Sequence, residues 1–211
     1  MAEAASSVDR RAQARIARRE QLIAATMKCI ARKGLSSMTL SDVAKQAGLS
    51  QGIVNLHFDS KDNLLNETLR HVANDYRDQF EKALKRAEPT PAARLLAVLE
   101  LDLKPSICDR NKLAVWFAFW GEVKSRPTYR KICDEYDRYY DSEVERLCEE
   151  IIEDGGYDVD AAAAAEALTS LTNGLWLSFL ISPKDFDRDT AMNAIMSYLT
   201  NVFPNHYERT T

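Results

Sequence analysis

Glycine and proline are scarce in this sequence, which contains 7 and 6 of them among 211 residues. No segment alternates strictly between apolar and polar residues, as a half-buried strand does. A protein made of many short strands needs frequent glycine and proline for its turns and alternating residues for its strands, and this sequence has neither. The frequent residues are instead Ala, Leu, Arg and Glu, which favour helix. The composition therefore predicts an all-α protein.

Long apolar runs are also missing. No stretch reaches the roughly 20 residues that cross a bilayer, and the Arg-rich residues 1–19 lack the apolar part of a secretory signal. The cysteines form no Cys-x-x-Cys pair, which indicates free thiols in a reducing compartment. We therefore expect a cytoplasmic protein without a membrane segment. The cysteines are Cys29, Cys108, Cys133 and Cys148.

Motifs for catalysis or metal binding are not found. The sequence has no Gly-rich phosphate loop and no nucleophile motif. It has no Glu-x-x-His pair of the kind that holds metals inside helical bundles. The three histidines, His57, His71 and His206, do not have the spacing of metal ligands. We therefore expect no catalytic residues, no cofactor and no metal, and so no enzyme.

Charge is distributed unevenly along the chain. The formal net charge is −4, but residues 1–70 contain 11 Lys and Arg against 7 Asp and Glu, which makes that part +4 and the remainder −8. A basic N-terminal part on an acidic body is the pattern expected when only the N-terminal part meets nucleic acid.

Residues 39–58 have the pattern of a helix-turn-helix, whose second helix enters the DNA major groove. Thr39 starts the first helix with a capping box, the small Ala44 lets the helices cross closely, and Gly48 permits the positive φ of the turn. Ser50 is placed to cap the second helix and is a candidate DNA contact at its start. The polar side chains left to meet DNA are Gln51, Asn55 and His57.

Two alternatives to this interpretation stay open. The pattern is also compatible with a helical hairpin that does not bind DNA. His57 in particular also suits a packed position in the core of a small domain.

The rest of the chain consists of segments with helical spacing of apolar residues, separated by prolines and glycines. One of them, 112–123, is apolar on nearly every side, which predicts a buried central helix. The expected helices cover about 10–32, 39–48, 50–58, 60 to the prolines at 89 and 91, 91–103, 112–123, 129–155, 159–181 and 188–203.

Residues 15–67 resemble the DNA-binding domain of the TetR family of bacterial transcriptional regulators. The resemblance rests on the long basic first helix, on Ala44–Ser50 and on the exit Phe58–Leu65. The chain departs from the family at residues 55–57, where Asn-Leu-His replaces a segment that is often rich in Tyr.

This resemblance implies roles for individual residues. Thr39 and Lys61 would hold phosphates, through a helix N-terminus and an ammonium group. Gln51 and Asn55 would face base edges, and His57 would lie on the DNA backbone or a base edge.

The C-terminal part resembles the BetI-like subgroup, whose namesake represses choline-to-betaine genes. The matching segments are 114–120, 127–130 and 173–177. The resemblance implies a dimer whose recognition helices enter successive major grooves of a palindromic operator, with repression relieved by a small-molecule effector.

Aromatic residues of the C-terminal part have two interpretations. Two tryptophans stand one helical turn apart in 112–123, and two tyrosines repeat that spacing in the next helix. Such rings can line a pocket for choline or another alkylammonium compound, with Glu122 as the counter-charge, or they can simply fill a core. The candidate rings are Trp116, Phe119, Trp120, Tyr136, Tyr140 and Trp176.

We predict two domains, a helix-turn-helix DNA-binding domain over 10–66 and a helical ligand-binding and dimerisation domain over 67–211. The last two helices carry stripes too apolar to remain in water, so we expect them to pair with those of a second copy. The alternative is a helical-bundle binding protein or enzyme that does not act on DNA. The candidate contacts between copies are Leu171, Leu175, Ile195 and Tyr198.

Overall fold

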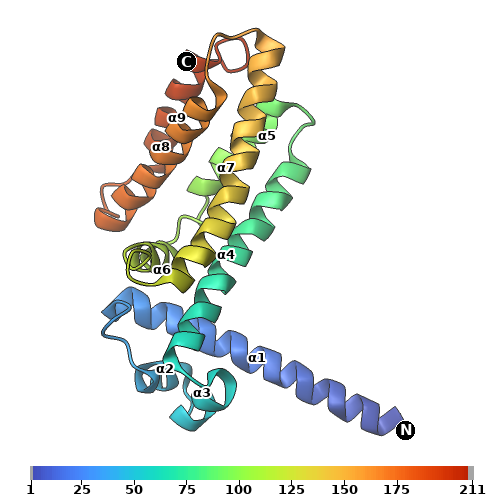
Figure 1. Cartoon of the computed structure of the whole chain (residues 1–211), viewed down its shortest axis with the longest axis vertical. Helices are drawn as coiled ribbons and strands as arrows, with labels where there is room; N and C mark the ends of the chain where they lie inside the picture. The colour runs from blue at the N-terminus through green and yellow to red at the C-terminus, as the bar shows by residue number, and fades with distance from the viewer. Residues whose placement is uncertain (1, 209–211) are drawn as a thin grey trace. The chain divides into compact units, whose positions relative to one another are not determined.

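The computed structural model describes the backbone of residues 2–208 and the side chains of residue 10 and residues 12–208. Every regular element in that part of the chain is an α-helix, which confirms the predicted all-α fold (Figure 1). The elements are α1 (Ala2–Lys33), α2 (Leu40–Ala47), α3 (Gln51–Phe58), α4 (Lys61–Arg86), α5 (Pro91–Leu103), α6 (Arg110–Trp120), α7 (Pro127–Gly155), α8 (Ala161–Ile181) and α9 (Arg188–Val202).

The helix boundaries agree with the predicted ones to within a few residues, except at the start of α1. That helix begins at Ala2 and not near Arg10. The predicted stop at Gly34 is confirmed, since this residue has φ 77° and donates its N–H to the Ile30 carbonyl oxygen at 2.8 Å. No helix among residues 2–208 is long and apolar enough to cross a membrane.

The chain divides into two compact units. The first holds the residues up to Val72 together with Ala114–Tyr129, and the second holds Ala73–Leu113 and the residues from Arg130 onward. Helix α4 therefore contributes to both units, and most of α6 belongs to the first. The predicted functional domains, 10–66 and 67–211, stay a prediction.

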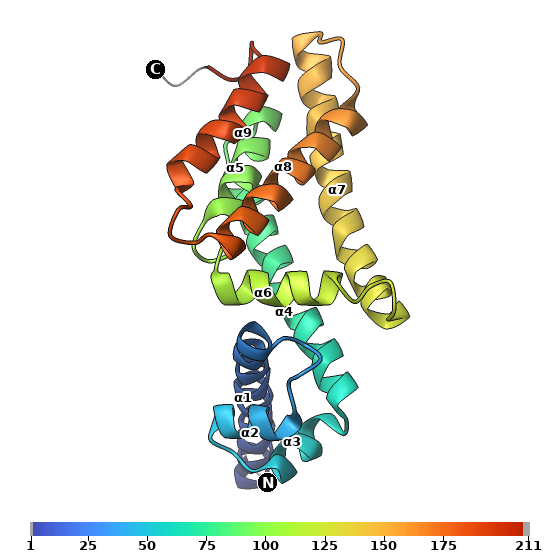
Figure 2. The same ribbon diagram turned by 90° about the vertical axis from the view of Figure 1, so that its left-hand side faces the viewer.

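The first unit is built around the apolar face of α1. Figures 1 and 2 show the short helices α2 and α3 beside α1, with the start of α4 following them. Positions one helical turn apart supply the buried side chains, and each such side chain contributes about 1.5–3 kcal/mol when fully buried. The fully buried residues of α1 to α4 include Leu22, Val43, Val54, Phe58, Leu64 and Leu69.

The second unit has a core of its own, formed by α5, α7, α8 and α9. Helix α9 packs against α5 and α8, as Figure 2 shows. Leu95, Leu99 and Leu103 place one residue per turn of α5 into this core. The predicted apolar stripes of the last helices also contribute, with Leu168 and Ile195 fully buried.

All four cysteines are free, as the sequence predicted, and the structure shows that all four are also buried. Burial raises the pKa of the Cys108 thiol to about 11 and the pKa values of Cys133 and Cys148 to about 12. It also raises the pKa of Cys29. A thiol in such surroundings is protonated at neutral pH and reacts poorly.

Candidate DNA interface and effector site

The predicted helix-turn-helix geometry is present in residues 39–58. Gly48 follows α2 with φ 67° and ψ 33°, the left-handed conformation that glycine adopts without strain. The next N–H, that of Leu49, donates to the Ala44 carbonyl oxygen at 2.9 Å and closes the turn. Val43, Ala44 and Val54 are buried where the helices meet, so the orientation of α3 is fixed by packing.

The N-terminus of α2 carries the predicted capping box. Thr39 Oγ1 accepts from the Asp42 N–H at 3.1 Å, and the Thr39 N–H donates to Asp42 Oδ2 at 3.0 Å. The hydrogen bond from Lys33 is the largest of the causes that hold the pKa of Asp42 at about 2. Thr39 is therefore occupied by the cap, and a phosphate at this end would meet the N–H groups of Leu40 and Ser41.

Helix α3 has an exposed face with polar residues and a buried apolar face. Gln51 and Asn55 are exposed, one turn apart, while Val54 and Phe58 on the opposite face are buried. Leu56 is 72% exposed, and the sequence analysis did not select it. Ser50 occupies the N-cap position, but its side chain makes no capping hydrogen bond, so that part of the prediction is wrong. Its hydroxyl lies at the exposed start of the helix.

His57 is half-buried beside basic residues of α1. A cleft of about 520 Å³ is lined by His57, Leu56 and Ile53 of α3 and by Arg15 and Arg18 of α1. Burial is the main cause that lowers the pKa of His57, and the arginines lower it further, so its imidazole is neutral at pH 7. The position fits neither a fully packed core residue nor a fully exposed one.

Arg15 and Arg18 are candidate phosphate ligands that were not predicted from the sequence. The sequence could have indicated them, because they stand three residues apart in a basic helix and therefore lie on the same face of it. Arg19, the next residue, is engaged instead in the fold. It donates to the His57 carbonyl oxygen at 2.7 Å and pairs with Glu67 at 3.0 Å.

Lys61 lies at the first turn of α4, close to the loop that leads into α2. Its Nζ donates to the Ser36 carbonyl oxygen at 3.2 Å. The structure thus brings Lys61 near the segment that ends at Thr39, as the two predicted phosphate contacts require. Their binding of phosphate stays a prediction.

The aromatic residues of α6 stack on one another in the first unit. The Trp116 and Trp120 rings are 5.8 Å apart, and the Phe119 ring packs edge-on against Tyr129 at 4.9 Å. Trp116 and Phe119 are buried, as expected of a central helix. The indole N–H of Trp120 is buried without a hydrogen-bond partner among the described residues.

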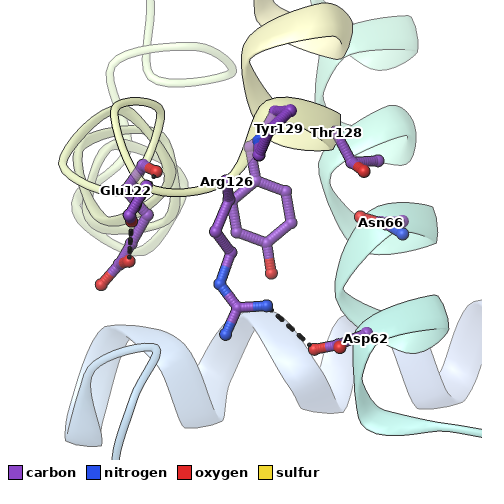
Figure 3. Close-up of a pocket in the computed structure, with 8 residues that line it drawn as sticks. Asp62, Asn66, Glu122, Arg126, Thr128 and Tyr129 are labelled. Carbon is purple, nitrogen blue, oxygen red and sulfur yellow. Dashed lines mark hydrogen bonds and ion pairs between the residues drawn. The ribbon is translucent and has the colours of Figure 1, made fainter.

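Glu122 lies in a polar cleft of the same unit. The cleft has a volume of about 510 Å³, and Asp62, Arg126 and Tyr129 are among its other lining residues (Figure 3). Glu122 Oε2 accepts from the Ser125 hydroxyl at 3.0 Å, and Arg126 pairs with Asp62 at 3.1 Å. The predicted counter-charge therefore shares its cleft with the ion pair of Arg126 and Asp62, and its own carboxylate is hydrogen-bonded to a hydroxyl of the same chain.

A second aromatic group lies in the other unit, around a carboxyl that the sequence analysis did not select. Asp102, at the end of α5, is 0% exposed. Its Oδ1 accepts from the Tyr76 hydroxyl at 2.8 Å and its Oδ2 from the Tyr140 hydroxyl at 3.1 Å. The Trp176 indole N–H donates to the Asp102 carbonyl oxygen at 2.8 Å. Burial raises the pKa of Asp102 to about 7.

The predicted effector residues are thus distributed over both units. Tyr140 and Trp176 are brought together around Asp102, whereas Tyr136 donates to Asn74 Oδ1 at 2.6 Å and lies under Arg77. Asp102 had a signal in the sequence, because it stands at i+7 from Leu95, on the face that α5 buries.

The predicted pairing residues differ in their accessibility. Ile195 is 0% exposed and offers no surface to a second copy. Leu171 and Leu175 are half-buried, and the Tyr198 hydroxyl donates to the Ala164 carbonyl oxygen at 3.3 Å. The exposed large apolar side chains of α8 are Leu177, at 42%, and Ile181, at 70%.

Comparison with known sequences gives matches to both parts of the chain. Residues 22–68 match the family described as bacterial regulatory proteins, tetR family, and residues 91–204 match that described as BetI-type transcriptional repressor, C-terminal. The HTH-type transcriptional regulator BetI of Paraburkholderia phytofirmans is 32% identical over 188 residues, covering 88% of this chain and 93% of the relative. That of Burkholderia thailandensis is 34% identical over 182 residues, covering 86% and 91%.

Solved structures of similar fold include transcriptional regulators from other bacteria. One from Pseudomonas aeruginosa PAO1 has a TM-score of 0.78 and 28% identity and covers 89% of this chain and 91% of its own. One from Saccharomonospora viridis, in complex with choline, has a TM-score of 0.75 and 25% identity and covers 86% of this chain and 94% of its own.

Proposed function

Because the chain belongs to the TetR family of bacterial transcriptional regulators, with a C-terminal part of the BetI type, we propose that it represses transcription as a homodimer on a palindromic operator. We further propose that an alkylammonium compound, such as choline, releases it from the DNA. As a protein that binds chromosomal DNA, it would act in the cytoplasm.

The exposed face of α3 is the observation that carries the DNA-binding proposal. Gln51 and Asn55 stand one turn apart on that face, and the buried Val54 and Phe58 hold the helix in place. Amide side chains can donate and accept together, which suits the paired donor and acceptor of an adenine edge. A dimer would have to set its two recognition helices about 34–36 Å apart to meet successive major grooves.

Operator binding can be tested on the DNA upstream of the protein's own gene, by fluorescence anisotropy over a range of salt concentrations. Lys61→Ala should weaken specific and random DNA alike and reduce the salt slope by about 1. Gln51→Ala and Asn55→Ala should cost about 1–3 kcal/mol on the specific site and little on random DNA. Lys85→Ala, at the far end of α4 with its side chain 78% exposed, is the control that should change neither.

Equal losses on both DNAs for the variants of Lys61, Gln51 and Asn55 would contradict the assignment of base contacts. A wild-type chain without affinity for any selected DNA would contradict the proposed function itself.

Two observations support the effector proposal. The similar structure from Saccharomonospora viridis contains choline, and each unit of this chain contains a group of aromatic rings whose faces attract organic cations. Calorimetry with choline and with its uncharged isostere, 3,3-dimethylbutanol, tests the charge requirement. Choline should bind more tightly and should release the operator, whereas equal binding of the two compounds would contradict a cationic effector.

A further inference from the structure

Asp102 is a fully buried acid without a basic partner. No ion pair among the described residues includes it. Arg188, which reaches the same end of α5, donates to the carbonyl oxygens of Leu103 and Cys108 instead. An ionised carboxylate in such surroundings is costly unless a positive charge compensates it.

The aromatic side chains around the Asp102 carboxyl can form a binding site for a positively charged group of a ligand. Tyr76 from α4 and Tyr140 from α7 donate to its two oxygens, and their ring centroids are 5.9 Å apart. The Trp176 ring of α8 meets Tyr76 edge-on at 6.1 Å. Both tyrosines are only partly buried, whereas the Asp102 carboxyl that accepts from them and the Trp176 side chain are buried.

We propose that Tyr76, Tyr140 and Trp176 form the contact surface for the ammonium group of the effector, and that Asp102 supplies its negative charge from behind the two tyrosines. This inference rests on the proposed function and deepens it. Asp102 acts through the phenols that donate to it, because a carboxylate makes these oxygens and rings more negative and so better partners for a cation.

The position of Asp102 favours it over Glu122 as the counter-charge. Glu122 is only half-buried, so water screens its charge, and its carboxylate already accepts from the Ser125 hydroxyl. The charge of Asp102 is not offset by a basic side chain and is shielded from water, so it acts on a nearby cation at a lower effective dielectric constant. The same charge repels carboxylates, so the effector class is a monocation and not a zwitterion.

The test measures choline and 3,3-dimethylbutanol binding to the full chain by calorimetry, with Asp102→Asn and Glu122→Gln as the matched pair. Asparagine keeps the size of the side chain and can still hydrogen-bond both tyrosines. Asp102→Asn should lower choline affinity by about tenfold or more at pH 8 and leave the neutral isostere unchanged. Glu122→Gln should leave both unchanged. A merely structural role for Asp102 would change both ligands together.

The pH profile is a second readout. Because the pKa of Asp102 is about 7, wild-type affinity for choline should be about tenfold higher at pH 8 than at pH 6. Burial raises the pKa values of Tyr76 and Tyr140 well above 10, so neither tyrosine titrates in this range. Asp137, with a pKa of about 6, does titrate in this range. Because Asp102→Asn keeps Asp137, any pH dependence of choline affinity that remains in this variant comes from Asp137 or other groups, and the part that is lost comes from Asp102.

Tyr140→Phe provides an independent variant if Asp102→Asn does not fold. Loss of this donor removes a hydrogen bond that lowers the pKa of Asp102, so the midpoint of the choline profile should move to higher pH. A wild-type preference for choline that persists in Asp102→Asn, or that disappears in Glu122→Gln, overturns the inference and leaves the proposed function standing. A wild-type chain without that preference contradicts the cationic effector itself.

Discussion

Replacement of Asp102 by asparagine should alter how the stability of the ligand-free protein depends on pH. Burial raises the pKa of this carboxyl from 3.8 to about 7, so between these values the folded chain holds a proton that the unfolded chain has released. The stability that this proton contributes is fully present below about pH 4 and is lost as the pH rises through 7. Each unit of difference corresponds to about 1.4 kcal/mol, so wild type loses about 4 kcal/mol in all.

Asp102→Asn lacks the titrating group and should not show this loss. The free energy of unfolding of the variant relative to wild type should therefore increase by about 3 kcal/mol between pH 5 and pH 8. Urea unfolding followed by circular dichroism measures it, at one protein concentration because the proposed pairing would also affect stability. The difference between the two chains cancels other titrating groups, such as Asp137.

Parallel unfolding free energies for the two chains across this range would refute the reasoning, since they would mean that Asp102 has an ordinary pKa when folded. A difference that decreases with pH would also refute it, because that sign requires a carboxyl whose pKa is lowered on folding.

Further substitutions test the turn, the pairing and the recognition helix. Gly48→Ala should destabilise the chain by about 1 kcal/mol in thermal or urea unfolding because of its φ of 67°, whereas Gly52→Ala, inside α3, should not. Ile181→Glu and Leu177→Glu should give monomers in sedimentation at micromolar concentration, and a variant that still pairs would show that α8 pairs elsewhere. Leu56→Ala should abolish any gain in affinity that a thymine gives over a uracil at one position of a selected operator, because the thymine methyl group is the apolar base-edge group that a leucine can recognise.

The fold was predictable because its signals are local. Helical spacing of apolar residues, the capping box at Thr39 and the glycines at 34 and 48 depend on neighbours within a few residues, and the structure has each of them. The Ser50 cap was not predictable in the same way. Its backbone takes the N-cap conformation, but the hydrogen bond also depends on a side-chain rotamer that the sequence pattern does not determine.

The candidate DNA contacts were predicted from local sequence signals, whereas the proposed effector site depends on contacts between distant segments. Gln51 and Asn55 belong to one short helix whose buried face is obvious. Asp102 receives its partners from α4 and α7, which are distant in sequence, and only packing brings them together. Glu122 was selected because it follows the aromatic residues along the chain, although its contacts lie elsewhere.

The residues predicted to pair two copies show another limit of prediction from sequence. An apolar stripe indicates that a helix face is covered, but not whether the cover comes from the same chain or from another. The stripe that contains Ile195 is covered by the chain's own core, whereas Ile181 is left exposed.

The buried cysteines make chemical inertness a property of the folded state and not of the sequence. Cys29 lies in the unit with the helix-turn-helix, and Cys148 lies in the core of the other unit. A thiol reagent can modify either one only after the surrounding helices open, so the rate of modification measures the opening free energy of each unit separately. The chain thus carries native probes of local unfolding in both units, and a ligand that stabilises one unit should slow alkylation of the cysteines in that unit without any label being introduced.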